Sequence, residues 1–364
     1  MILDDRSEIA RIDAGSMLDH VSRFGRMTLE GWDAAAGVPL PAGGHAGGPT
    51  AVAVMGMGGS GIGGELLRSL LAPTAAIPVI VVRDDRLPKF VGSGTLAFVC
   101  SYSGGTEETL TAYDAARTAG ASIVAITSGG VLADRARRDR CPTVRIPGGL
   151  SPRAALPYLF MPMLRIVARM GIVRVDEADV HEAATLLITL AGRWGVAVPT
   201  EDNPPKRLAE RLAGCLPAIY AASQMTAPAA QRWKTQLNEN SKMLAVWNAF
   251  PELGHNETVG WAGAPAGAGE PGLFVVILRD RDDSERTALQ VEVTRGLAFG
   301  RARGVEGVWS VGMSRLARLL SLVLAGDFIS VYLAVLRGVD PTPVDVITQM
   351  KLKMQEAQQA RGMV

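Results

Sequence analysis

The chain has 364 residues, a net charge of +1 at pH 7, and 48% hydrophobic against 20% charged residues. This length predicts two domains with connectors, and the composition allows a sizeable core and argues against disorder. Lysine and arginine are scattered without a basic stripe, which argues against a nucleic-acid partner. The longest apolar runs fall short of the roughly 18 residues that a membrane span requires.

The amino terminus and the cysteines predict a cytoplasmic protein. Residues 1–6 lack the basic and then apolar order of a signal peptide. The cysteines, Cys100, Cys141 and Cys215, are odd in number and show no CxxC spacing, so we expect thiols rather than disulfides or metal ligands. The histidines at positions 20, 45 and 181 are also far apart in sequence, and we assign no metal site.

The first half of the chain alternates strand and helix patterns. Residues 7–36 are predicted to be helical because their apolar positions fall on one side, and 37–49 form a Gly/Pro linker that carries His45. Continuous Val/Ile runs followed by helical segments are typical of a parallel sheet covered on both faces. The predicted strands are Ala51–Met55, Pro78–Val82, Leu96–Cys100, Ser122–Ile126 and Thr143–Ile146. The predicted helices are Gly63–Leu71, Glu107–Ala119, Leu132–Asp139 and Leu156–Met170.

A helical connection over Glu177–Gly195 and Lys206–Ala213 leads to a second, less regular α/β half. Its predicted strands are Leu216–Ala221, Leu244–Trp247, Leu273–Leu278 and Gly307–Val311, and its predicted helices are Ala229–Gln236, Ser284–Phe299 and Ser314–Arg337. Asp340-Pro341-Thr342-Pro343 is expected to start a last helix, since proline is tolerated in the first turn. We therefore divide the chain into an amino-terminal helical segment with its linker (1–49), a first subdomain (50–171), a helical connector (172–205), a second subdomain (206–340) and a carboxy-terminal helix (341–364).

A glycine-rich turn follows the first predicted strand, with Gly58, Gly59 and Ser60 at its centre. A strand that breaks into such a turn and then a helix points bare N–H groups at one spot, where the helix dipole also attracts an anion. The glycines at 56, 58 and 61 also match the G-x-G-x-x-G dinucleotide fingerprint, with Asp84 and Asp85 after the next strand. A tight turn without a ligand is the third possibility.

A second turn follows the strand Leu96–Cys100 and carries the hydroxyls of Ser101, Ser103 and Thr106. Glu107 and Glu108 then suit the positive end of a helix dipole. A simple helix cap needs only one such hydroxyl, so the cluster favours a phosphate-binding pocket over a cap. Together the two turns predict a phosphorylated small molecule as the ligand.

These segments resemble the sugar isomerase (SIS) fold, and more closely the bifunctional phosphoglucose/phosphomannose isomerases of archaea and bacteria. The more specific matches are Pro152–Ala155, Asn238-Glu239-Asn240-Ser241-Lys242, His255-Asn256-Glu257 and 336–343 with Lys351 after it. The resemblance runs from about residue 50 to the carboxy terminus. It implies an α/β fold of two SIS-type subdomains, each a parallel sheet flanked by helices in three layers, with helices at both ends of the chain.

The resemblance implies a metal-independent aldose–ketose isomerase that needs no cofactor. Its substrates would be fructose 6-phosphate and glucose 6-phosphate, mannose 6-phosphate, or both, interconverted through a cis-enediolate. In this role Glu239 would move the proton between C2 and C1, with the neighbouring asparagines orienting it, and Arg153 would stabilise the enediolate. His255 would open the sugar ring, either within its own chain or across the interface of a homodimer. Lys351 would assist ring opening or bind ring hydroxyls.

Simpler interpretations of these residues remain open from sequence. Glu239 or Lys351 could be an ordinary helix-surface charge, and His255 could be a loop histidine. Gly105 stands where the family often has asparagine, which removes one side-chain amide from the phosphate pocket. Two other functions are also possible: a sugar-phosphate-binding regulator that does not use Glu239 or His255, and a nicotinamide-dependent oxidoreductase that uses the glycine fingerprint.

Overall fold

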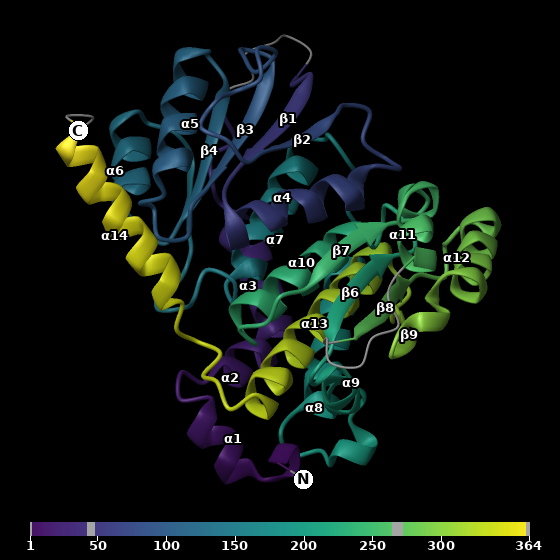
Figure 1. Ribbon diagram of the computed structural model, residues 1–364. Helices are drawn as coiled ribbons and strands as arrows, with labels where there is room; N and C mark the ends of the chain where they lie inside the picture. The colour runs from purple at the N-terminus through teal and green to yellow at the C-terminus, as the bar shows by residue number, and fades with distance from the viewer. Residues whose placement is uncertain (1, 42–47, 264–271, 362–364) are drawn as a thin grey trace.

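The chain folds into two parallel sheets with helices on both faces, as Figure 1 shows for the computed structural model. The structure describes residues 2–41, 48–263 and 272–361, so His45 of the linker lies outside the described residues. The predicted α/β class with two sheets and terminal helices is confirmed.

The first sheet has five parallel strands in the order β2-β1-β3-β4-β5. The strands are β1 (Ala51–Met55), β2 (Val79–Val82), β3 (Thr95–Cys100), β4 (Ser122–Thr127) and β5 (Thr143–Arg145). Alternate residues of the central strands pack to opposite sides: Val54 joins the cluster under α4 (Gly58–Leu71) and α7 (Leu156–Arg169). Met55 instead joins the cluster under α5 (Glu107–Thr118) and α6 (Gly130–Arg138). Burial on both faces explains the unbroken apolar runs.

The second sheet has four parallel strands in the order β7-β6-β8-β9. The strands are β6 (Leu216–Ala221), β7 (Val246–Ala249), β8 (Leu273–Arg279) and β9 (Gly304–Trp309). The helices α10 (Ala227–Glu239) and α13 (Arg315–Leu336) cover one face, and α11 (Glu257–Gly263) and α12 (Glu285–Leu297) cover the other. The structure thus places the predicted second strand later in the chain and the predicted fourth strand earlier.

Helix α13 is the central helix of the core. It is long and apolar enough to cross a bilayer, but 94% of its most apolar window is buried inside the protein, which is the behaviour of a core helix. Two of its polar side chains, Asp327 and Ser330, are buried as well and accept hydrogen bonds from Arg232 and Asn240.

The amino-terminal segment is three helices rather than the single helix expected over 7–36: α1 (Arg6–Ile12), α2 (Met17–Ser22) and α3 (Phe24–Ala34). The break arises because the two carboxylate oxygens of Asp13 accept the backbone N–H groups of Met17 and Leu18 at 2.7 and 2.9 Å. The same turn brings Gly15 against Thr342, where an added Cβ would lie 2.1 Å from the threonine Oγ1.

Two helices, α8 (Glu177–Trp194) and α9 (Pro204–Leu212), connect the sheets and pack on α13. The last helix, α14 (Asp345–Ala360), contains no buried residue. It leaves the turn at 340–343 and passes beside α5, where Gln358 Nε2 donates to Glu107 Oε2 at 3.1 Å (Figure 1, yellow).

Candidate active site

The two predicted phosphate loops meet at the carboxyl edge of the first sheet. The backbone N–H of Tyr102 in the second loop donates to Ser60 Oγ in the first at 3.3 Å. Ser101 Oγ and Thr106 Oγ1 are 3.1 Å apart, and Ser101 Oγ also accepts from the Gly104 N–H. Ser60, Ser101 and Thr106 therefore form one group of hydroxyls, whereas Ser103 is exposed and, among the described residues, accepts only from the Gly105 N–H in its own loop.

The helices that follow these loops keep uncapped amino termini. Thr106 is the N-cap residue of α5 but makes no side-chain cap bond, because its hydroxyl faces Ser101. Helix α4 begins at Gly58, earlier than the expected Gly63, and no side chain caps it either. Among the described residues, the N–H groups of Gly58 and Gly59 at the start of α4 and those of the first turn of α5 have no acceptor and can bind an anion, which is what a phosphate site requires, whereas the Ser60 N–H donates to the Met57 carbonyl at 2.9 Å.

Three glycine positions show what the loops require. Gly58 has φ of +51°, in the left-handed region that favours glycine. A Cβ on Gly59 would lie 3.0 Å from the carbonyl of Pro152, so the first loop can approach the Arg153 segment only without a side chain. Gly105, in contrast, has open space around its Cβ position, so the fold does not itself require the departure from the family's asparagine.

The first prediction concerns the phosphate loops. Thr106→Ala should raise the KM for the sugar phosphate by roughly 10- to 100-fold, because a hydrogen bond to a charged group contributes about 1.5–3 kcal/mol. Steady-state kinetics would measure the change. Thr111→Ala, on the exposed side of the same helix, is the matched control. An unchanged KM in the Thr106 variant would remove this hydroxyl from the phosphate site.

Arg153 lies in the turn before α7 and reaches across to the second half of the protein. Its Nε donates to Asn240 Oδ1 at 2.6 Å, and its Nη2 donates to the carbonyls of Pro341 and Thr342 at 2.7 and 2.8 Å. Burial lowers the pKa of this guanidinium, and the carboxylate of Glu239 acts in the opposite direction. An arginine stays protonated under such conditions, so the site contains a fixed buried cation.

Glu239 is the last residue of α10, and its Oε2 lies 3.4 Å from Arg153 Nη1. Its side chain keeps 28% of its surface exposed, enough for a ligand to reach it. The neighbouring asparagines do not orient it as expected. Asn240 bonds to Arg153 instead, and the buried Oδ1 of Asn238 has no hydrogen-bond partner among the described residues.

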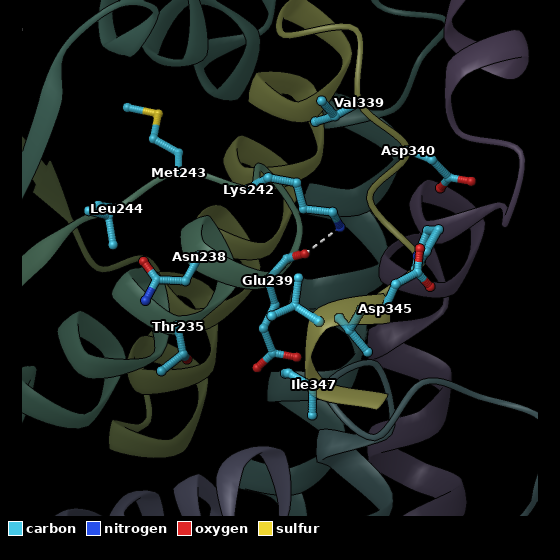
Figure 2. A pocket seen from close by; sticks show the side chains of 13 residues that line it. Thr235, Asn238, Glu239, Lys242, Met243, Leu244, Val339, Asp340, Asp345 and Ile347 are labelled. Carbon is cyan, nitrogen blue, oxygen red and sulfur yellow. Dashed lines mark hydrogen bonds between the residues drawn. The ribbon is translucent and has the colours of Figure 1, made fainter. Parts of the chain in front are cut away.

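A cavity of about 800 Å³ opens beside Glu239, between the end of α10 and the start of α14. In Figure 2 the Glu239 carboxylate lies near Ile347 of α14, while Lys242 approaches from the opposite side. Lys242 Nζ donates to the backbone carbonyls of Glu239 and Pro341 at 2.6 and 3.0 Å. Its φ of +52° is unusual for a residue with a side chain and suits a functional site.

Comparison with known proteins identifies the family. A bifunctional phosphoglucose/phosphomannose isomerase from Caldicellulosiruptor bescii is 45% identical over 306 residues, covering 84% of this chain and 89% of the relative. One from Thermoplasma acidophilum is 36% identical, covering 83% and 89%. The chain belongs to the bifunctional phosphoglucose/phosphomannose isomerase family.

Two further comparisons agree with this family. Residues 201–354 match the model of the bacterial phospho-glucose isomerase C-terminal SIS domain. A glucose-6-phosphate isomerase like protein from Thermus thermophilus superposes with a TM-score of 0.61 at 22% identity, covering 96% of this chain and 98% of that one, which shows the shared fold.

The other two expected family residues, His255 and Lys351, lie on exposed parts of the chain. His255 ends the short helix Glu252–His255 after β7 and is exposed. No hydrogen bond joins it to Glu239, Arg153 or the phosphate loops among the described residues. Lys351 is exposed on α14, which runs from the cavity beside Glu239 to the start of α5.

Two residues of the site have roles that the sequence did not reveal. Asn240 and Lys242 lie in the Asn-Glu-Asn-Ser-Lys segment that matches the family, but their partners are Arg153 and the 341–342 turn. The positive φ of Lys242 has no signature in sequence. Family membership, by marking the whole segment rather than Glu239 alone, is the signal that could have found them.

Proposed function

We propose that the protein interconverts fructose 6-phosphate with both glucose 6-phosphate and mannose 6-phosphate. Relatives that share 45% and 36% identity over most of the chain carry the name of that bifunctional activity. The observation that carries the proposal here is the pairing of Glu239 with the buried Arg153 at 3.4 Å, next to loops suited to a phosphate.

In the proposed mechanism the phosphoryl group binds to the hydroxyls of Ser60, Ser101 and Thr106, to the N–H groups of Gly58 and Gly59 and to those of the first turn of α5. Glu239 removes the proton from C2 and returns it to C1, so that one carboxylate acts as base and then as acid. Arg153 Nη1 donates to the oxygens of the cis-enediolate as their negative charge develops. Rotation about C2–C3 lets either epimer present its C2–H to the same base.

The family membership supports an isomerase over a phosphate-binding regulator. The proposed isomerisation moves a proton and needs no electron acceptor, so phosphate binding by the glycine-rich turn accounts for the reaction without a dinucleotide. Purified protein incubated with fructose 6-phosphate in the presence of a chelator should form glucose 6-phosphate and mannose 6-phosphate. Product identification by enzymatic coupling or NMR tests both epimers at once, and binding of the substrate without turnover would favour the regulator.

We also propose a homodimer in which His255 of the partner subunit completes the site. His255 is exposed and, among the described residues, forms no hydrogen bond with Glu239; both observations support this arrangement, in which His255 transfers the proton of ring opening. Lys351, on the helix that borders the cavity, would bind ring hydroxyls. A cytoplasmic location is proposed as well, supported by the three free thiols.

A second prediction tests the shared site by complementation. Glu239→Gln and His255→Ala should each be inactive or nearly so as separate proteins. After subunit exchange, a mixture of the two should recover about a quarter of wild-type activity, because half of the dimers are mixed and each holds one intact site. Mixing His255→Ala with itself is the control. A mixture that stays inactive would place His255 outside the partner's site.

A further inference from the structure

We propose that Asn240 is a positioning residue that fixes the orientation of the Arg153 guanidinium, and that Ser330 of the core helix α13 supports it. The inference rests on the isomerase function proposed above. Asn240 follows Glu239 at the end of α10 and has no exposed surface.

The hydrogen bonds of Arg153 leave little of its guanidinium free. Four of its five N–H groups have acceptors: Nε on Asn240, two on Nη2 with the 341–342 carbonyls, and one on Nη1 with Glu239. Only the second N–H of Nη1 has no acceptor among the described residues. Since Nη1 is also the group nearest Glu239, the arrangement directs one free donor to the place where the proton transfer occurs.

The side-chain amide of Asn240 is in turn fixed by a hydrogen bond to helix α13. Its Nδ2 donates to Ser330 Oγ at 2.9 Å, and the Ser330 hydroxyl donates to the backbone carbonyl of Asp327 at 2.7 Å. Because the amide nitrogen is committed to Ser330, the amide oxygen must face Arg153 Nε. Asn240 and Ser330 are fully buried, so water does not compete for these bonds.

The backbone of Arg153 is tied to the same core helix by a second route. Arg232 Nη2 donates to the carbonyl of Arg153 at 2.8 Å, and Arg232 also forms a two-point ion pair with Asp327 at 2.9 and 2.7 Å. Arg232 thus holds the backbone of Arg153 in place, and Asn240 sets the direction of the Arg153 guanidinium. Loss of Asn240 would leave the buried Nε without an acceptor and let the guanidinium turn away from Glu239.

Kinetics of two matched variants test the role. Asn240→Ala should lower kcat by about 10- to 100-fold with little change in KM, because a misplacement of about 1 Å can cost 10²-fold. Asn203→Ala is the control, since Asn203 is equally buried and its amide also bonds on both sides, but to Trp194, Gly195 and Lys206, none of which lines the cavity or bonds to Arg153. Asn240→Asp keeps an oxygen for Arg153 Nε and should recover most of the kcat that Asn240→Ala loses.

A measurement that does not depend on turnover tests the positioning role of Asn240 separately from the proposed isomerase function. The Arg153 Nε–H signal in a ¹H–¹⁵N spectrum, assigned by its loss in Arg153→Lys, should exchange slowly in the wild type and in Asn203→Ala. It should be lost to fast exchange in Asn240→Ala, while the Arg232 and Arg318 signals, bonded to Asp327 and Asp280, persist.

A persistent Arg153 signal in Asn240→Ala, or an equal loss of kcat in both alanine variants, would overturn the positioning role even if the protein is an isomerase. An inactive wild type would instead overturn the proposed function, and the spectrum would still decide the positioning role. If Asn240→Ala does not fold, Asn240→Asp carries the test: it should retain the Arg153 signal, and loss of that signal would overturn the proposal.

Discussion

Glu239→Gln should reduce kcat by about 10²- to 10⁴-fold, the usual contribution of a positioned acid–base group. Glutamine has nearly the shape of glutamate, but its amide cannot remove the C2 proton. The KM for fructose 6-phosphate should change little, because the phosphate loops lie on the other subdomain. Steady-state kinetics and exchange of the C1 or C2 proton with deuterium from solvent would measure both effects.

The control for this variant is Glu292→Gln. Glu292 also pairs with an arginine, with its Oε1 3.2 Å from Arg279 Nη1, but it belongs to α12 on the far face of the second sheet. It should keep wild-type turnover. A Glu239→Gln protein that retains turnover within a few-fold of the wild type would show that another group acts as the base.

Arg153→Lys should lower kcat by about 10²- to 10³-fold, the range found when a donor to a developing oxyanion is removed. A lysine keeps the positive charge, but its compact ammonium cannot reach Asn240, Glu239 and the 341–342 carbonyls together. The loss should therefore appear in kcat and in the affinity for a phosphorylated hydroxamic acid that mimics the enediolate.

Arg279→Lys is a fitting comparison, because Arg279 is also buried and bonds to Asp283 and Glu292 away from the cavity. Both variants should lose some stability in urea unfolding, but only Arg153→Lys should lose turnover. Equal turnover in the two proteins would assign Arg153 to folding alone.

Much of the first half could be predicted from sequence because its central strands are continuous apolar runs that are buried on both faces. The predicted and observed bounds of those strands nearly coincide. The amino-terminal helices could not be separated, since the apolar positions keep their helical spacing across the break at Asp13. In the second half the predicted bounds of the edge strands β7 and β9 differ from the observed ones. Both strands have exposed residues, which weaken the apolar pattern on which a strand prediction depends.

The phosphate loops were predictable for a geometric reason. The carboxyl ends of neighbouring parallel strands share one edge, so Ser60 after β1 and Ser101 after β3 had to lie close together. The bond between Arg153 and Asn240 joins residues 87 positions apart and depends on how the two sheets pack. No local sequence pattern encodes that packing. From sequence alone, Asn240 was therefore predicted to orient its neighbour Glu239 rather than Arg153.

The contact between Gly15 and Thr342 has a consequence for anyone who shortens this protein. The backbone carbonyl of Thr342 accepts a hydrogen bond from Arg153 Nη2. The side chain of Thr342 leaves no room for a methyl group on Gly15. The segment around Gly15 therefore packs on the turn to which Arg153 donates its hydrogen bonds, and so supports the site indirectly. A truncated protein that starts at β1 would lose this packing. Tags should therefore be fused ahead of α1 and should not replace α1.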